Sequence, residues 1–307
     1  MKLNGGHGGR ALLMLAAFSL GAAAGISFAR GQALADSSAN RAARVNSILS
    51  EAFNAMAGVY DYRGTLVKRE RFGDELIEQK LAFKFSRPFK VYVKYLEPHE
   101  GREGIYVRGS NRNRLRAHSG SVPDLAVSLS PRGRVAMTDN HHPITSFGLE
   151  RMLEVAALNI NKAMQRGDAV LELSNGGMVN GEPTWRIDIE SNAGGRTVTA
   201  KRNEDVWELA TRVGQNMYII VHHNEEIDSP TDLRAGQEVF VPHYYAGRGR
   251  YYIGKRSFMM VKAQSWDHRG ELYESYEFAD LELNPGLEDR DFDHRNKDYD
   301  FVLINQR

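Results

Sequence analysis

Cysteine is absent from the 307-residue chain. The protein therefore forms no disulfide, no thiolate metal site and no cysteine nucleophile, and we do not expect it to be a lipoprotein itself. An excess of one charge is also missing, because 40 lysines and arginines stand against 39 aspartates and glutamates. This balance excludes a dedicated nucleic-acid binder, which carries a clear basic excess. The 42% of hydrophobic residues is typical of a globular protein with one or two domains.

Recognisable catalytic motifs are missing as well. The sequence contains no Gly-x-Ser-x-Gly, no P-loop, no dinucleotide fingerprint and no His-Glu-x-x-His. Histidines occur as the adjacent pairs His141-His142 and His222-His223, whose side chains should diverge, and we expect them at the surface or in loops. We therefore predict no catalytic residue, no metal ligand and no cofactor, and we interpret the chain as a binding protein rather than an enzyme.

Three aspartates near the end of the chain have the spacing that begins a calcium-binding loop. They are Asp289, Asp291 and Asp293, but His294 stands where such a loop requires glycine. We interpret this segment as a solvated, capped tail.

The first 35 residues are predicted to be a secretory signal peptide. Lys2 and Arg10 give a basic start, residues 11–29 carry no charge, and Ala33 and Ala35 form a small-x-small cleavage pattern. The alternative is an uncleaved anchor, because an uncharged run of this length can just span a bilayer core. Cleavage is favoured because the run is rich in alanine and glycine, and the protein is then expected in the periplasm or elsewhere in the cell envelope.

Hydrophobic periodicity predicts a mixture of helices and strands. Apolar stripes at helical spacing cover residues 40–58 and 149–164, and Ser146 or Thr145 is the expected cap of the second helix. Residues 117–143 are interpreted as a loop region. Alternating apolar and polar residues predict strands at 81–85, 89–95, 105–107, 169–173, 185–189, 251–266 and 272–283. Such strands form an antiparallel sheet with one apolar face.

Residues 196–243 interrupt this pattern with a strand, two helices and a strand. Gly194-Gly195 precedes them, and Gly247-Arg248-Gly249 follows. Glycine-rich hinges around a compact unit indicate an insertion between two strands. In the alternative, the sheet ends before residue 196 and the tail is a separate unit, which is less favoured because two strands alone do not form a stable domain.

The interrupting unit resembles the LysM peptidoglycan-binding module over its whole length. Val206-Trp207-Glu208-Leu209-Ala210 matches the start of the first family helix, Gly214 the glycine between the helices, and Asn224 and Ile227 the end of the second. The closing strand signature is matched by Leu233, Gly236, Gln237, Val239, Val241 and Pro242. The resemblance implies an inserted βααβ LysM module over 196–246 that binds N-acetylglucosamine-containing glycan.

LysM modules bind glycan in a shallow groove between the loop before the first helix and the loop after the second. By resemblance, the groove residues are Asn203, Glu204, Asp205, Val206, Ile227, Asp228, Ser229 and Pro230. One departure is that Asn203-Glu204-Asp205 replaces the usual Gly-Asp-Thr. The two carboxylates can cap the helix, but they replace a hydroxyl and a flexible glycine at the edge of the groove.

With this unit set aside, the order of elements resembles the LolA, LolB and RseB group of exported proteins. Matching segments include Val93-Lys94-Tyr95-Leu96, Ser128-Leu129-Ser130-Pro131 and Asn284-Pro285-Gly286-Leu287. The resemblance implies an α+β fold in which a curved antiparallel sheet forms a half-barrel with helices on its concave side. The half-barrel would comprise residues 36–195 and, as closing strands and tail, residues 247–307.

For function, the LolA-like resemblance implies a hydrophobic cleft for acyl chains of lipids or lipoproteins. The expected lining residues are Leu81, Phe83, Phe85, Val91, Val93, Tyr95, Trp185 and Ile187. The alternative is that these residues form a packed core against the helices. The leading hypothesis is a non-catalytic envelope protein that binds a lipid or lipoprotein and is tethered to peptidoglycan by the LysM module. The alternatives are a LysM-targeted peptidoglycan hydrolase and an envelope sensor similar to RseB.

Overall fold

The computed structural model describes residues 16–121, 125–191, 194–227 and 233–301. The chain divides into two compact units, Met1–Asn46 and Ser47–Arg307. Among the described residues, no helix combines the length and the apolar content needed to cross a membrane.

Helix α1, Ala16–Ala57, begins in the first unit and ends in the second. In the second unit it buries Ile48, Leu49, Ala52 and Met56. These residues belong to the stripe predicted over 40–58, so the helix is confirmed there, although it begins earlier than the stripe.

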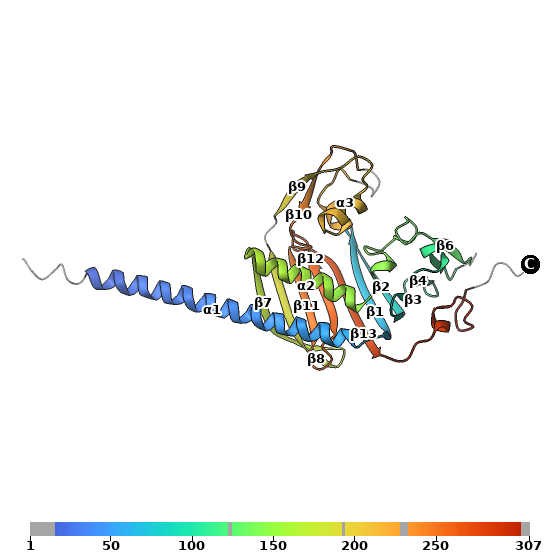
Figure 1. The fold of residues 1–307 in the computed structure, drawn as a ribbon, viewed down its shortest axis with the longest axis horizontal. Helices are drawn as coiled ribbons and strands as arrows, with labels where there is room; N and C mark the ends of the chain where they lie inside the picture. Colours follow the sequence, from blue (N-terminus) through green and yellow to red (C-terminus); the bar gives the residue numbers. More distant parts are fainter. Residues whose placement is uncertain (1–15, 122–124, 192–193, 228–232, 302–307) are drawn as a thin grey trace, which may run out of the picture. The chain divides into compact units, whose positions relative to one another are not determined.

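Eleven antiparallel strands form one sheet within the described residues (Figure 1). Their order in space is β6-β5-β4-β3-β2-β1-β13-β12-β11-β8-β7, so β6 and β7 are edges and the curved sheet does not close. The strand bounds are β1 Asp61–Phe72, β2 Glu75–Ser86, β3 Lys90–Glu97, β4 Glu103–Val107, β5 Leu115–His118, β6 Val127–Leu129, β7 Ala169–Val179, β8 Glu182–Ser191, β11 Arg248–Gly254, β12 Met260–Trp266 and β13 Leu272–Leu283. With its few helices, the molecule has the α+β architecture that the sequence predicted.

Several strands differ from the sequence-based expectation. The sequence pattern did not indicate the central strand β1, because Lys68 and Glu70 occupy positions where alternation would require apolar residues. The supposed loop 117–143 contains the end of β5 and all of β6, which are too short to give a period. The single strand predicted over 251–266 is divided into β11 and β12 by a turn.

The inner face of the sheet, which we define as the face carrying Phe83 and Phe278, holds an aromatic core. The rings of Phe83 and Phe278 lie 5.5 Å apart, and Tyr62 lies 5.9 Å from Phe83 and 4.8 Å from Phe85. Phe147, from the loop before the next helix, also contacts Phe83 at 5.3 Å. This cluster fixes the middle of the sheet against the segments that cover it.

Helix α2, Leu149–Arg166, lies over the inner face and contacts β7, β8 and β12 (Figure 1). The short helix η2, Ile144–Ser146, precedes it. The predicted cap at Thr145 or Ser146 is wrong, because the N-cap is Gly148, which has no side chain to cap the helix. Instead, the Leu149 N–H donates a hydrogen bond of 2.9 Å to the Tyr62 hydroxyl on β1. A side chain of the sheet therefore satisfies one of the N–H groups that the first turn of α2 leaves unpaired.

Residues 287–301 pack against the outer face of the sheet at β3 and β4. Phe292, Tyr299 and Phe301 are buried against Tyr92 and Ile105, and the Tyr92 and Tyr299 rings stack at 4.1 Å. The segment includes the short helix η3, Asp289–Phe292, while η1, Asn111–Asn113, follows β4. The prediction of a capped segment is confirmed, because Glu288 and Asp291 form a capping box at η3. Its description as solvated holds only in part, because Phe292 between the aspartates and two aromatic residues beyond them pack against the sheet.

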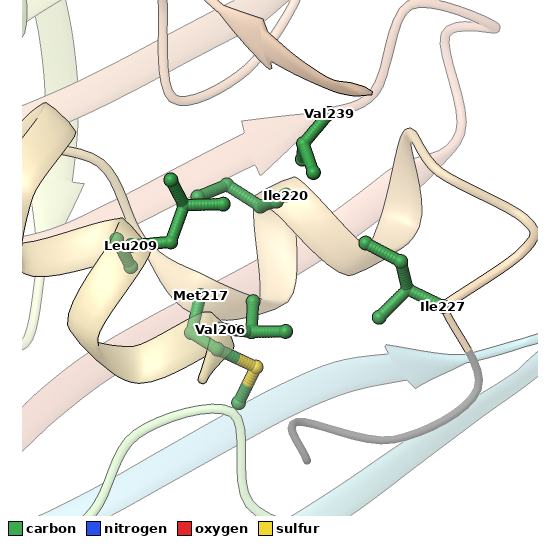
Figure 2. Packing of buried hydrophobic residues seen from close by; sticks show 7 residues of the cluster. Val206, Leu209, Met217, Ile220, Ile227 and Val239 are labelled. Carbon is green, nitrogen blue, oxygen red and sulfur yellow. The ribbon is translucent and has the colours of Figure 1, made fainter. Parts of the chain in front are cut away.

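Between β8 and β11 lies a small unit that we call the inserted unit, residues 195–242. It consists of β9 Gly195–Thr199, α3 Val206–Val213, α4 Met217–His222 and β10 Glu238–Pro242. β9 pairs only with β10 among the described strands, whereas β8 pairs directly with β11. The unit has its own core, to which both helices, the loop after α4 and β10 contribute: Val206, Leu209, Ala210, Met217, Ile220, Ile227 and Val239. Figure 2 shows these side chains converging, with all but Ala210 labelled.

Gly148 provides a test of how α2 is attached to the sheet. Its φ is +121°, and a Cβ there would lie 2.6 Å from the Tyr62 hydroxyl. We expect Gly148→Ala to lower the free energy of unfolding by about 1–3 kcal/mol, because the backbone is strained and the Tyr62–Leu149 bond is disturbed. Urea unfolding followed by circular dichroism measures the change.

The matched control is Gly73→Ala, where φ is +59° but nothing lies within 4 Å of the added carbon. Its cost should be smaller, because it carries the backbone strain without the clash. Equal losses in the two variants would contradict a specific role for the Tyr62 contact.

Candidate functional site

A cavity of about 790 Å³ lies between the inner face, the segment from Pro131 to Gly148, helix α2 and the inserted unit. Its walls are mainly apolar. The sheet contributes Leu66, Leu81, Val93, Leu115, Val127 and Phe278, α2 contributes Met152, Val155 and Leu158, and the inserted unit contributes Trp207, Ala210 and Met217. The volume falls in the range of cavities that hold a small organic ligand.

Small residues leave space above part of the inner face of the sheet. Gly104 on β4 lies between Leu115 and Val93, and a Cβ there would come within 3.3 Å of both side chains. Ala117 on β5 is paired opposite Gly104 and also lines the cavity. Larger side chains at these two positions would fill the space that the cavity occupies.

At one end of the cavity the inner face is charged. Glu70 on β1 and Glu274 on β13 lie opposite each other in the strand register, and both are at most 3% exposed. We call them the acidic pair. Lys68 donates from Nζ to Glu70 Oε2 at 2.8 Å and to Asn140 Oδ1 at 2.6 Å, and the Tyr276 hydroxyl donates to Glu70 Oε1. Buried carboxylates require such partners because isolated buried charge is very costly.

The two histidines of the loop before η2 meet the same carboxylates. His141 Nδ1 lies 2.8 Å from Glu274 Oε1, and His142 Nε2 lies 3.3 Å from the same oxygen. Both histidines lie in a loop, as predicted, but His141 is buried at 2% exposure, and the two side chains converge rather than diverge. A loop backbone, unlike a strand or helix, can direct adjacent side chains to one group. Even so, no group of residues suited to a metal ion occurs in the described part of the chain.

The inserted unit is connected to this network. Tyr245, just beyond β10, donates from its hydroxyl to Glu274 Oε2 at 2.5 Å and lies 3.1 Å from His142 Nε2. Tyr218 of α4 stacks on the His141 ring at a centroid distance of 5.2 Å. The acidic pair thus joins the sheet, the histidine loop and the inserted unit.

Electrostatics keep the acidic pair ionised. Burial raises the pKa of Glu70, but Lys68 and the two histidines outweigh burial and leave it below the ordinary value. Burial likewise opposes ionisation of Glu274, yet His142 and His141 hold its pKa well below the usual range. Burial lowers the pKa of His142, but the Glu274 carboxylate outweighs it, and the net shift is upward.

The predicted lipid-lining residues fall into two groups. Leu81, Val93 and Tyr95 line the cavity. Phe83, Phe85, Val91 and Ile187 are buried among other side chains and do not line it, and Trp185 is half-buried against Phe258. Sequence reasoning missed the charged end, because its residues lie on unpredicted β1, on the loop and on β13. The adjacent histidines were the available signal.

The predicted glycan-groove residues are only partly described. Asp228, Ser229 and Pro230 lie outside the described residues. Val206 and Ile227 are buried in the core of the inserted unit (Figure 2). Asp205 caps α3 by accepting from the Glu208 N–H at 2.7 Å, so the expected capping role of this carboxylate is confirmed.

Asn203 and Glu204 form the turn before that cap. Asn203 has a φ of +59°, which asparagine tolerates better than most residues. Glu204 accepts two hydrogen bonds from Arg212, at 2.6 and 2.8 Å, and this guanidinium is the main cause that lowers the pKa of Glu204 to about 2. Among the groove predictions, these two residues and Asp205 therefore occupy one connected turn.

The fold and the cavity together define an α+β protein with an open antiparallel sheet and an internal, mainly apolar binding space. The family model described as "protein of unknown function (DUF1571)" matches residues 59–301, and the chain belongs to this family. The search among curated proteins returned no match.

Solved structures with partial similarity include three bacterial proteins. A DUF1329 family protein from Desulfovibrio piger is 11% identical, with 81% of this chain and 97% of that chain covered and a TM-score of 0.36. A LolA superfamily protein from Nitrosomonas europaea is 13% identical (81% and 96% covered, TM-score 0.31). The lipoprotein LppX from Mycobacterium tuberculosis is 12% identical (79% and 98% covered, TM-score 0.36). With TM-scores this low, these similarities establish neither the fold nor the function of this chain.

The His142–Glu274 pair predicts how stability depends on pH. The pKa of His142 is raised in the folded protein, so its protonation stabilises the fold. This contribution to the free energy of unfolding is complete below the ordinary histidine pKa of about 6.5, and it is lost as the pH rises through the raised pKa of the folded state. We expect the free energy of unfolding to fall above about pH 6.5 in the wild type and to fall less steeply in His142→Gln. Urea unfolding at a series of pH values measures both slopes.

The control for this measurement is His99→Gln, because His99 is exposed in a turn. The free energy of unfolding of His99→Gln should change with pH as steeply as that of the wild type. Parallel slopes for the wild type and His142→Gln would contradict the role given to this ion pair.

Proposed function

We propose that the protein is a non-catalytic binding protein of the cell envelope whose cavity holds the acyl chain of a lipid or lipoprotein. The observation that carries this proposal is the 790 Å³ cavity with mainly apolar walls on the inner face. An unfilled apolar space of this size is costly in a packed interior, and it is retained where a ligand fills it. The LolA-like resemblance of the sequence supports the same ligand class.

Apolar side chains at the rim of the cavity give the ligand a route inward. Val127, Val135 and Leu158 line the cavity and are 44%, 68% and 51% exposed. Exposed aliphatic groups grouped at an opening are typical of surfaces that receive an apolar partner. The opening therefore suits a molecule that is transferred from an apolar environment.

The charge state of the acidic pair argues against the hydrolase alternative. A glycosidase requires one carboxylic acid with a raised pKa that remains protonated to donate to the leaving group. Glu70 and Glu274 have lowered pKa values and are held by Lys68 and the histidines. These two carboxylates therefore suit a structural anchor.

We also propose that the inserted unit is a LysM-like module that binds peptidoglycan. The support is the βααβ order of β9, α3, α4 and β10 together with the family motif residues quoted from the sequence. Its glycan-contacting residues would be the turn of Asn203, Glu204 and Asp205, the adjoining Val206 and Ile227, and the loop of Asp228, Ser229 and Pro230. Contact with the wall would raise the local concentration of the cavity near its envelope ligand.

The lipid proposal predicts that acyl-containing molecules co-purify with the protein. Protein prepared from its native envelope without detergent is extracted with organic solvent, and the extract is analysed by mass spectrometry. Ala117→Phe places a ring where the sheet surface is low, so it should lower the acyl content several-fold. Val170→Phe adds the same ring at a 56% exposed position on β7 and should leave the content unchanged. An acyl-free wild type would overturn the proposal.

The wall-binding proposal predicts retention on purified peptidoglycan. The comparison is between residues 36–307 and a variant in which a short linker replaces 196–246. The Ser191 N–H donates to the Gly247 carbonyl at 2.8 Å, so the end of β8 lies beside the first residue after the replaced segment. The variant should lose most of its retention in a pull-down, and circular dichroism checks that the sheet remains folded. Equal retention of both proteins would exclude the unit as the wall-binding part.

A further inference from the structure

A second cavity, of about 280 Å³, lies between the end of α2 and the inserted unit. Lys162 and Arg166 of α2 and Arg196 of β9 line it together with His243. The rest of its lining consists of Val213, Gly214, Gln215, Val241 and Pro242, so no acidic residue faces this space among the described residues. Three cations around one small cavity make it strongly electropositive.

Among the described residues, Arg166 is the one of these three cations that forms an ion pair with an acid. Arg166 pairs with Asp168 at 2.7 Å and lies in the last turn of α2, where the carbonyl groups favour a basic side chain. Within the described part of the chain, neither Lys162 nor Arg196 has an ion pair with an acid. Burial and the neighbouring Arg196 both lower the pKa of Lys162. A half-buried lysine beside a like charge is unfavourable until an anion neutralises both.

Lys162 also lines the main cavity, so the two cavities meet at this side chain. The acidic residues lining the main cavity are at most 3% exposed, whereas Arg132 and Arg151 at its rim are exposed. The accessible charge around the apolar space is therefore basic. An apolar cavity adjoining a cationic one matches a molecule with an apolar chain and an anionic group.

We propose that Lys162 and Arg196, assisted by Arg166, bind the phosphate group of a lipid whose acyl chain lies in the main cavity. This inference rests on the lipid-binding function proposed above and specifies its ligand class. A phosphate group suits the site because guanidinium groups bind its oxygens in a forked geometry and two or more cations match its double charge. The volume of 280 Å³ accommodates a head group of this kind beside the chain-binding space.

The test is isothermal titration of the full mature chain, stripped of bound lipid, with three probes. Lysophosphatidic acid carries the chain and the phosphate, monoacylglycerol of the same chain length carries the chain alone, and inorganic phosphate carries the anion alone. Lysophosphatidic acid should bind at least about tenfold more tightly than either of the others. Lys162→Met and Arg196→Met should each weaken its binding about tenfold. Arg196 does not line the main cavity, so Arg196→Met should leave the affinity for monoacylglycerol unchanged.

Lys80→Met is the matched control, because Lys80 is exposed and lines neither cavity. Arg196 is exposed, so its replacement tests the site even if Lys162→Met fails to fold. Equal binding of lysophosphatidic acid and monoacylglycerol, unaffected by the variants, would overturn the phosphate site and leave the lipid cavity standing. Inorganic phosphate binding as tightly as the lipid would overturn the lipid origin of the anion. If neither lysophosphatidic acid nor monoacylglycerol binds, the lipid-binding function is overturned as well.

Discussion

The structure depends on how two buried carboxylates are neutralised. Glu70 and Glu274 face each other across the central strands β1 and β13, in a position that an apolar sheet would fill with aliphatic residues. Their partners include Lys68 from β1, Tyr276 from β13, His141 and His142 from the loop before α2, and Tyr245 just beyond the inserted unit. Because removing one partner would leave buried charge uncompensated, these contacts specify where the loop and the unit lie on the sheet.

The cavity follows from this arrangement. The loop and the inserted unit are fixed at the charged end of the inner face, and α2 is fixed through Tyr62 and the aromatic cluster. The residues between these two attachments include Gly104, Ala117 and Ala263, which are too small to reach the opposite wall. Space therefore remains between sheet and cover. Polar contacts at the acidic pair and aromatic packing at Tyr62 thus hold the cover on the sheet on either side of an unfilled apolar space.

The inserted unit has two relations to function. Trp207 and Met217 form part of the cavity wall, and Arg132 from the loop before α2 lies 5.0 Å from the centre of the Trp207 ring. The unit is therefore built into the binding space rather than joined to it by a linker. The core of the unit lies between α3, α4 and β10 (Figure 2), and if the unit binds glycan as proposed, the same unit contributes both to wall contact and to the wall of the cavity. This arrangement places the cavity close to any wall strand that the unit holds.

The local sequence pattern was enough to predict the elements with a clear hydrophobic period. These are the alternating strands β2 and β3, helix α2 with its apolar stripe, and the βααβ order of the inserted unit. It failed for β1, because Lys68 and Glu70 replace the apolar residues that mark an inward face. It also placed Phe83, Phe85 and Val91 in a cleft, because an inward-facing residue gives the same period whether the space opposite is filled or empty. Only the tertiary structure decided that question. Cavity walls, the acidic pair and the Lys162–Arg196 site each require residues more than 30 positions apart in the sequence, and periodicity reports only which side of one element is apolar.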